Sequence, residues 1–439
     1  MNILYIRANF PKLSETFILE ELIRLKEMGH TVKVFASFGE LHKVHPKVAR
    51  HQMFDNVIYN RVFLDPADEP KTFQPSQNWS PKTSPWVFFK DFLHDQTARK
   101  EVFRKISQSK AQGRFSFLKD CRQFFQLAFH LKNVSIAANQ FIHSDEIENF
   151  IPDIIHSTFA TLPHLIVANK LAEKYGNIPY TVCFRAKDLY STPEPDPAIR
   201  KALIYKAARV ITISKYNEAF IHSTYPGLKG LSIIHSSIDT SFFSPDKNIG
   251  KNKNQIVSVG RFIEKKGFNH LIQACAILKQ RGYSFQCRII GEGPLKKNLN
   301  KLIRELGLKN YIRLQGPFSQ DEIRRCLNES EVFVLPCRIV SDKNRDILAN
   351  AIKEAMSMEL PVITSGISGI EELITNGQNG ILIPPETPEL IAKELEKLFK
   401  DRDQARRLGQ EARQKAVTDF DVQSESKKLS KIFESLIKK

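Results

Sequence analysis

Two carboxylates, Asp346 and Glu354, are the acidic residues whose spacing is best suited to chemistry. Apolar residues recur around them at helical intervals, so the sequence predicts a helix that begins at Asp346 and carries Glu354 just over two turns later. Both acids would then face one cleft. Carboxylates there would accept hydrogen bonds from ribose or sugar hydroxyls. The alternative interpretation is a solvated pair on a helix surface.

A basic loop at residues 260–267 follows an apolar run that predicts a strand at 255–259. Its Arg261 and Lys266 could stabilise a leaving diphosphate, because cations at such an edge oppose the developing negative charge. Taken alone, the loop fits a solvated basic turn better. No His or Cys spacing indicates a metal site. Cations of the protein, rather than a metal or a cofactor, are therefore expected to hold the diphosphate.

Two glycine turns follow other predicted strands. One contains Gly291 (residues 291–294) and the other contains Gly369 (residues 366–369). Glycine allows a tight turn for purely steric reasons, so each motif is weak by itself. A helix beginning after the second turn could offer backbone N–H groups to an anion.

The first half of the chain has fewer candidate residues. Arg185, Lys187 and Asp188 follow a predicted strand, and a surface ion pair between Lys187 and Asp188 is slightly favoured over a functional role. Ser14 and Glu15 precede a predicted helix and fit a helix cap better than a nucleophile.

Alternating strands and helices place these residues in an α/β protein with parallel sheets, whose ligands bind beyond the carboxyl ends of the strands. A chain of 439 residues is too long for one ordinary core. We expect a first domain over 1–243, a linker over 244–254, a second domain over 255–420 and a closing helix over 421–439 that crosses back to the first domain.

The formal charge of +17 favours anionic partners, such as phosphates, nucleotides, nucleic acid or an acidic membrane. The six cysteines are typical of reduced core residues, and no apolar run is long enough to span a bilayer. The chain begins with a predicted strand rather than a signal peptide. A cytoplasmic location is expected.

An insertion at about 61–147 combines aromatic and basic residues in helical stretches. Within it, residues 86–132 could lie at an anionic membrane surface. Packing of the insertion on its own domain, with a solvated basic face, is an equally good interpretation. A nucleic-acid surface is a weaker third reading because no recognisable motif accompanies the charge.

Taken together, the motifs resemble those of the retaining glycosyltransferases of family 4, which have the GT-B architecture of two Rossmann-like domains facing a cleft. The nearest resemblance is to bacterial exopolysaccharide enzymes of the colanic-acid and amylovoran type. The order and spacing of the motifs carry it over most of the chain: residues 10–17, 186–190, 212–214, 260–267, 288–295, 332–337, 345–346, 354–356 and 379–385.

This resemblance implies a donor site for a nucleotide sugar, most often with UDP or GDP, in the second domain. Arg261 and Lys266 would hold its diphosphate, Glu354 its ribose hydroxyls, and Asp346 would lie near the transferred sugar. The turns at Gly291 and Gly369 would approach the donor.

The resemblance also implies an acceptor on the first domain, a glycan or a lipid-linked oligosaccharide, and transfer with retention and without a metal. The residues on that side of the cleft would be Ser14, Glu15, Arg185, Lys187 and Asp188.

Several positions depart from the family pattern. Arg185 and Thr158 stand where relatives commonly have histidine, Ile347 and Ala349 replace a usual glycine and proline, and Ser237 replaces a hinge glycine. An active hexosyltransferase is the expectation because the four charged donor-site residues are present. A GT-B sugar-nucleotide epimerase and a catalytically silent sugar-nucleotide or membrane-binding module are the alternatives.

Overall fold

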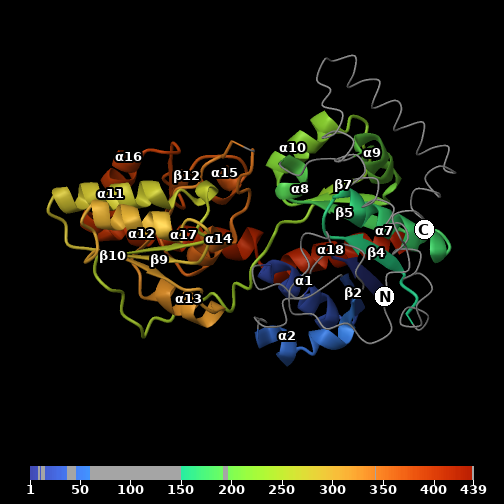
Figure 1. Ribbon diagram of the computed structural model, residues 1–439. Helices are drawn as coiled ribbons and strands as arrows, with labels where there is room; N and C mark the ends of the chain where they lie inside the picture. Colours follow the sequence, from blue (N-terminus) through green and yellow to red (C-terminus); the bar gives the residue numbers. More distant parts are fainter. Residues whose placement is uncertain are drawn as a thin grey trace, which may run out of the picture.

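The computed structural model of the chain describes residues 1–7, 10, 15–36, 46–59, 150–190, 196–341 and 343–437. The predicted insertion at 61–147, with its basic aromatic stretch 86–132, and the candidate Ser14 lie outside the described residues. Figure 1 shows the described chain as two lobes, each built on its own sheet.

The first lobe contains a seven-stranded sheet with the order β3-β2-β1-β4-β5-β6-β7, and all its neighbouring strands are parallel. Most of these strands are apolar and buried, as expected for a parallel sheet covered by helices on both faces. The strands are β1 (Asn2–Ile6), β2 (Thr31–Ala36), β3 (Val57–Tyr59), β4 (Ile154–Ser157), β5 (Tyr180–Phe184), β6 (Arg209–Thr212) and β7 (Leu231–Ile233).

The second lobe contains a six-stranded parallel sheet with the order β10-β9-β8-β11-β12-β13. In both sheets the order reverses beside the first strand, β1 or β8, and this reversal creates a crevice where ligands bind in such folds. The strands are β8 (Gln255–Val259), β9 (Gln286–Ile290), β10 (Ile312–Gln315), β11 (Val332–Leu335), β12 (Val362–Ser365) and β13 (Ile381–Ile383).

Helices connect the strands of both sheets. In the first lobe they are α1 (Thr16–Glu27), α2 (Pro46–Arg50), η1 (Met53–Asn56), α7 (Leu162–Lys174), α8 (Lys187–Tyr190), α9 (Pro197–Lys206) and α10 (Lys215–Thr224). After residue 254 the helices are η4 (Glu264–Lys266), α11 (Phe268–Gln280), α12 (Lys296–Glu305), α13 (Gln320–Asn328), α14 (Asn350–Ser357), α15 (Ile370–Leu373), α16 (Pro388–Lys400), α17 (Arg402–Asp419) and α18 (Val422–Ile437).

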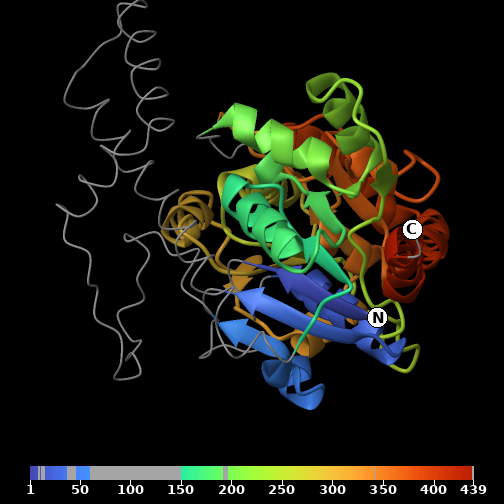
Figure 2. The same cartoon turned by 90° about the vertical axis from the view of Figure 1, so that its right-hand side faces the viewer.

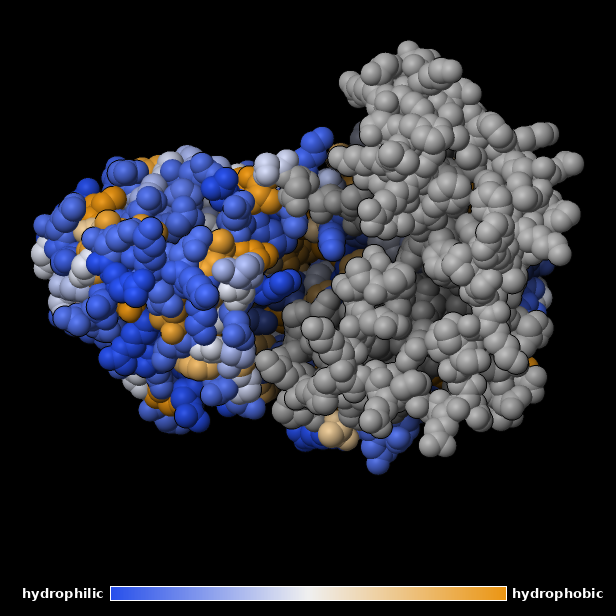
Figure 3. Space-filling model, viewed as in Figure 1, coloured by the Kyte–Doolittle hydropathy of each residue, from blue (hydrophilic) through white to orange (hydrophobic). Residues whose placement is uncertain are grey.

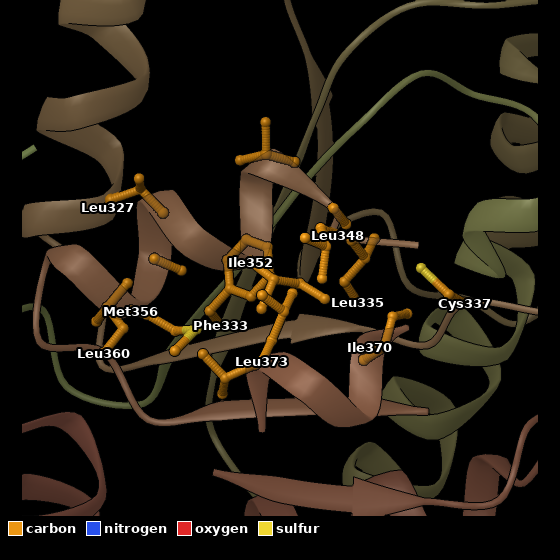
Figure 4. Packing of buried hydrophobic residues seen from close by; sticks show 14 of the residues in the cluster. Leu327, Phe333, Leu335, Cys337, Leu348, Ile352, Met356, Leu360, Ile370 and Leu373 are labelled. Carbon is orange, nitrogen blue, oxygen red and sulfur yellow. The ribbon is translucent and has the colours of Figure 1, made fainter. Parts of the chain in front are cut away.

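The core beneath the carboxyl edge of the second sheet is made by β11, α14 and α15. Figure 4 shows Phe333 and Leu335 of β11 packed among Ile352 and Met356 of α14 and Leu373 of α15. These side chains are fully buried. This apolar packing fixes the position of α14, which carries Glu354.

The closing helix α18 returns to the first lobe, as the sequence predicted. It packs along α1, and the ring of its Phe433 lies 5.4 Å from that of His156 in β4. The imidazole Nε2 of His30 is 2.8 Å from the hydroxyl of Ser430. Figures 1 and 2 both show the red C-terminal helix beside the blue strands of the first lobe.

Two predictions about composition can be compared with the described residues. The cysteines at 183, 275, 287, 326 and 337 are free and buried, which fits the interpretation of reduced core residues. No helix in the described ranges is both long and apolar enough to cross a bilayer. Figure 3 shows a mainly hydrophilic surface on the second lobe, with hydrophobic residues scattered over it.

Candidate active site

The basic loop after β8 folds tightly against the end of β11. Gly267 has φ = +66°, and a Cβ at this position would lie 1.9 Å from the carbonyl oxygen of Pro336. Only glycine accommodates both the left-handed backbone and this close approach. The turn therefore brings Lys265 and Lys266 beside the loop that follows β11.

Asp346 is the anionic partner of these two lysines. Its Oδ2 lies 2.8 Å from Nζ of Lys266, and its Oδ1 lies 3.3 Å from Nζ of Lys265. Burial alone would raise the pKa of Asp346, but Lys266 and then Lys265 lower it well below its usual value. Burial disfavours the charge of Lys266, yet the attraction of Asp346 outweighs it and raises the pKa of that lysine. The three side chains form a compact ion cluster.

The prediction that Asp346 begins a helix is wrong. Helix α14 begins at Asn350, and Asp346 lies four positions earlier in an irregular loop. Its carboxylate is held by the lysines and by the thiol of Cys337, which lies 3.4 Å from Oδ2, and it does not cap the helix. Ile347 and Leu348 are buried between the loop and the core. The apolar periodicity of the sequence therefore runs past the true helix boundary.

Glu354 lies in the middle of α14 and is 9% exposed. Burial raises the pKa of Glu354 to about 7, against the attraction of Lys353 and then Lys266. No hydrogen bond to its side chain is formed by the described residues. Glu354 is thus a desolvated acid within electrostatic range of Lys266, where a ligand hydroxyl could serve as its partner.

Lys353 is a functional candidate that the sequence did not reveal. It is completely buried, and its Nζ donates a hydrogen bond to the carbonyl oxygen of Ser236 in the hinge. Burial lowers the pKa of Lys353 to about 7. The hydroxyl of Ser236 also lies 3.3 Å from the side-chain oxygen of Asn350. Two hydrogen bonds therefore join α14, at its first turn and at its centre, to the loop that follows β7 and contains Ser236.

The two glycines of the expected donor site have clear steric roles. Gly291 has φ = +154°, and a Cβ there would lie 1.9 Å from the carbonyl oxygen of Gly260. A Cβ on Gly369 would lie 2.5 Å from Cγ2 of Ile347. Both glycines thus let the loops at the sheet edge approach one another closely.

Arg261 is placed differently from Lys266. Its side chain is exposed and makes no hydrogen bond or ion pair with the described part of the chain. A ligand phosphate would therefore not need to displace a protein carboxylate from Arg261, as it would from Lys266.

On the first lobe, Glu15 forms an ion pair with Arg7, at the end of β1. The predicted helix cap is therefore wrong for Glu15, because it stands at the N-cap position of α1 without capping the helix through its side chain. Arg7 also donates to the hydroxyl of Thr158 at 2.9 Å and lies over the ring of Phe159.

Asp188 is a structural residue of the first lobe and not part of a surface ion pair. It is 2% exposed, and its carboxylate accepts backbone N–H bonds from Ala160 at 2.9 Å and from Arg185 at 3.0 and 3.2 Å. These bonds join the loops that follow β4 and β5. Lys187 is exposed, whereas Arg185 is buried at the cleft edge of the sheet.

Two residues of the second lobe contact the first lobe next to these candidates. The carboxylate of Glu372, in α15, accepts backbone N–H bonds from Lys215 at 3.0 Å and Tyr216 at 2.7 Å, at the first turn of α10. Arg345 donates to the Tyr216 hydroxyl at 3.0 Å and lies 4.7 Å from the ring centre of Tyr190. We call these two residues the cross-lobe clamp.

The site combines ionised lysines, a paired carboxylate, a buried acid and close glycine turns at the crevice of the second sheet. Such a set can neutralise phosphate oxygens and accept hydrogen bonds from hydroxyls. In the part of the chain that the structure describes, no group of three or more His, Cys, Asp or Glu is placed to hold a metal ion.

Comparison with known sequences shows to which proteins the chain is similar. Residues 239–415 match the family model described as glycosyl transferases group 1. The chain is 24% identical over 448 aligned residues to the putative colanic acid biosynthesis glycosyltransferase WcaL of Salmonella typhimurium, covering 99% of this chain and 100% of that protein. It is 26% identical to the amylovoran biosynthesis glycosyltransferase AmsK of Erwinia amylovora, covering 99% and 100%.

Solved structures share the whole fold at low sequence identity. A glycosyltransferase from Rickettsia africae superposes with a TM-score of 0.68 at 18% identity, covering 100% of this chain and 98% of that one. The Anabaena protein HepE, solved in complex with UDP and glucose, gives a TM-score of 0.66 at 16% identity, covering 99% and 100%. These similarities show a common two-lobed fold.

Proposed function

Since the chain is related in sequence and fold to bacterial glycosyltransferases with the GT-B architecture, we propose that it is a retaining hexosyltransferase. It takes the hexose from a nucleotide sugar and passes it to a glycan or lipid-linked oligosaccharide in surface or exopolysaccharide biosynthesis. UDP is the preferred nucleotide of this proposal, because HepE was solved with UDP and with UDP-glucose.

The observation that carries the proposal is the cluster of Lys265, Lys266 and Asp346 at the crevice of the second sheet, with Glu354 nearby. Two ammonium groups lie within 3.3 Å of one carboxylate. A bound diphosphate would add negative charge beside these lysines, and the exposed Arg261 would provide a third cation. Cations fixed in this way favour departure of the diphosphate, because its charge grows as the glycosidic bond breaks.

The carboxylates have separate roles in the proposal. Glu354 accepts hydrogen bonds from the ribose hydroxyls, and Asp346 orients Lys266 and lies next to the transferred sugar. No metal is required for the leaving group, since the lysines and Arg261 neutralise it. The acceptor enters from the first lobe, past Arg185 and the Arg7–Glu15 pair. The enzyme works in the cytoplasm at the inner face of the membrane, with residues 86–132 as the membrane contact.

Alanine substitution of Lys266 or Glu354 tests this proposal. Each variant should lower kcat/KM by about 1000-fold, a loss typical of removing a preorganised charge or hydrogen-bonding group at a transition state. Transfer from UDP-[14C]glucose and related UDP-sugars to lipid-extracted acceptors would be followed by product analysis. Lys393→Ala and Glu411→Ala are matched controls, because both residues are exposed, on α16 and α17 of the same lobe.

Near-normal turnover by both active-site variants would exclude the assigned roles. Circular dichroism must show that the variants are folded. A parallel incubation without acceptor distinguishes transfer from epimerisation, because an epimerase would convert the donor sugar in that reaction and a transferase would not.

A further inference from the structure

The chain passes between the two lobes twice, and hydrogen bonds join the two passages. Residues 234–240 lead from β7 into the second lobe, and residues 420–422 lead from α17 back to α18. The N–H of Ile238 donates to the carbonyl oxygen of Phe420 at 3.0 Å, and the N–H of Val422 donates to that of Ile238 at 2.9 Å. We call these two segments the lobe junction. A change in the arrangement of the lobes must bend the chain here, because these segments are the covalent links between them.

The side chain of Lys353 joins α14 to the lobe junction. Lys353 is completely buried, and its Nζ donates to the carbonyl oxygen of Ser236 in the first segment. The same Nζ lies 5.9 Å from the ring centre of Phe420 in the second segment. Figure 1 shows α14 on the side of the second lobe that faces the first lobe. One lysine of the second lobe therefore reaches both segments of the junction.

The residue that follows Lys353 on α14 belongs to the candidate active site. Glu354 lies within electrostatic range of Lys266, and its side chain forms no hydrogen bond with the described residues. In the proposed function its carboxylate accepts hydrogen bonds from the ribose. A short helix moves as a rigid unit, because backbone hydrogen bonds connect its successive turns. A ligand that fixes Glu354 therefore also fixes Lys353.

A buried lysine costs stability that an apolar side chain would not. Burial lowers the pKa of Lys353 to about 7, while Glu354 and Glu425 oppose this change and Arg185 adds to it. Replacement of a buried ionisable group by an apolar group of similar size is often neutral or stabilising. The presence of a lysine at this position therefore needs a reason other than stability.

We propose that Lys353 is a positioning residue, which transmits occupation of the donor site from Glu354 to the lobe junction and so sets the arrangement of the two lobes during transfer. This inference rests on the proposed function, because the ligand that fixes Glu354 is the ribose of the nucleotide sugar. Transfer requires the donor sugar on one lobe and the acceptor on the other to be held within reaction distance. A hydrogen bond from α14 to the chain that connects the lobes is suited to control that distance.

Hydrogen exchange of the full chain, measured by mass spectrometry with and without UDP, tests the inference. In the unmodified protein, saturating UDP should slow exchange of the junction amides, including those of Ile238 and Val422, by about fivefold or more, the lower limit of typical coupling between two sites. Lys353→Met removes the N–H donors and keeps a long unbranched side chain. This variant should bind UDP with unchanged affinity, but UDP should no longer slow exchange at the junction.

Ser357→Ala is the matched control on the same helix. Ser357 is also fully buried, and its hydroxyl donates to the carbonyl oxygen of Phe243 at 2.6 Å. Phe243 lies past the junction, where Arg413 of α17 donates to the same carbonyl at 3.2 Å. Ser357→Ala should lower the unfolding temperature, yet UDP should still slow exchange at the junction. Lys353→Met should have the opposite pattern, with an unfolding temperature that is unchanged or higher.

The transfer assay provides a second readout. In Lys353→Met, kcat should fall about tenfold while KM for the donor stays unchanged, because the variant alters the relative position of the two substrates and not the binding of the donor. Ser357→Ala should keep both constants close to those of the unmodified protein. A purely structural role of Lys353 predicts instead that kcat follows the unfolding temperature in both variants.

Retention of the UDP effect by Lys353→Met would overturn the inference, as would its absence from the unmodified protein or its loss in both variants. Much weaker UDP binding by Lys353→Met would place the lysine in the donor site and would overturn the inference as well. The binding of UDP separates these outcomes from failure of the proposed function. If UDP does not bind the unmodified protein, the proposed transferase is wrong. If UDP binds and depends on Lys266, these outcomes exclude only the role of Lys353.

Discussion

The two lobes share one strand order but present different chemistry at the same edge. In the second lobe, glycines at 267, 291 and 369 bring backbone loops together, and lysines form an ion cluster with Asp346. In the first lobe, the corresponding edge carries the buried arginines Arg7 and Arg185, held against aromatic rings.

The difference teaches that the fold supplies the crevice, whereas the loop residues decide its ligand. Close backbone approach and clustered cations suit a diphosphate, which has many oxygens and a high charge. Rigid arginines with aromatic neighbours suit a smaller and more specific group. The following three predictions test this contrast, from the largest expected effect to the smallest.

Substitution of Gly291 should show how tightly the second edge is packed. Gly291→Ala should lower the free energy of unfolding by about 3 kcal/mol, because it combines a disfavoured backbone conformation with a clash against the carbonyl of Gly260. Gly29→Ala is the control in the first lobe. It also has a positive φ, of +86°, but no atom lies within 4 Å of its Cβ position, so a loss of about 1 kcal/mol is expected.

Urea denaturation followed by circular dichroism measures both variants. Equal losses for Gly291→Ala and Gly29→Ala would contradict the claim that the loops after β8 and β9 are in unusually close contact. A larger loss for the Gly29 variant would reverse the contrast between the lobes.

The pH dependence of donor binding should identify Glu354 as a titrating group of the second lobe. Burial raises the pKa of Glu354 to about 7, and ribose hydroxyls donate to the ionised carboxylate. Below pH 7 binding must therefore release a proton, so affinity for UDP-glucose should rise about tenfold between pH 6 and pH 8. Calorimetry in buffers of constant ionic strength measures this change.

Glu354→Gln should bind more weakly, with a flat profile over the same range. An unchanged pH profile in this variant would assign the titration to another group, such as Lys353, whose pKa burial lowers to about 7.

Loss of the cross-lobe clamp should have the smallest effect. Glu372→Ala should lower kcat several-fold, which corresponds to about 1 kcal/mol in activation free energy. In this variant two backbone N–H groups of α10 bind water instead of the carboxylate, so the contact between the lobes is weaker. UDP affinity should stay constant, since Glu372 faces the first lobe. Glu411→Ala removes an exposed acid from α17 and provides the control.

X-ray scattering of the same variants reports on the relative position of the lobes. A more extended Glu372→Ala protein with reduced kcat would confirm the role of the clamp. Weakened UDP binding with an unchanged scattering profile would instead place Glu372 in the donor site.

The sequence predicted the strands well where apolar runs are short and bounded by turn residues. The strand predicted at 255–259 matches β8 residue for residue. A strand of a parallel sheet is buried on both faces, so its apolar character is a local property of the sequence.

The start of α14 was not predicted correctly because Ile347 and Leu348 continue the apolar pattern of the helix. These residues are buried by contact with Gly369 and the core, not by helix formation. Asp346 was a candidate residue from the sequence, but the ion pair that holds it is made with Lys266, which lies in a loop 80 positions earlier.

The tertiary partners of single charged residues were beyond prediction. The hydrogen bond from Lys353 to Ser236 and the contact of Glu372 with α10 each join segments far apart in the chain. Asp188 was taken for a surface residue because a Lys-Asp dipeptide gives no sign of its backbone partner at Ala160.

The return of α18 to the first lobe has a consequence for synthesis on the ribosome. The first lobe is translated early, but the surface formed by α1 and His156 is covered only when Phe433 packs on it. Phe433 is translated after the entire second lobe. During translation the nascent first lobe therefore exposes an apolar groove that a chaperone could shield. Packing of this surface is completed only after α18 has left the exit tunnel.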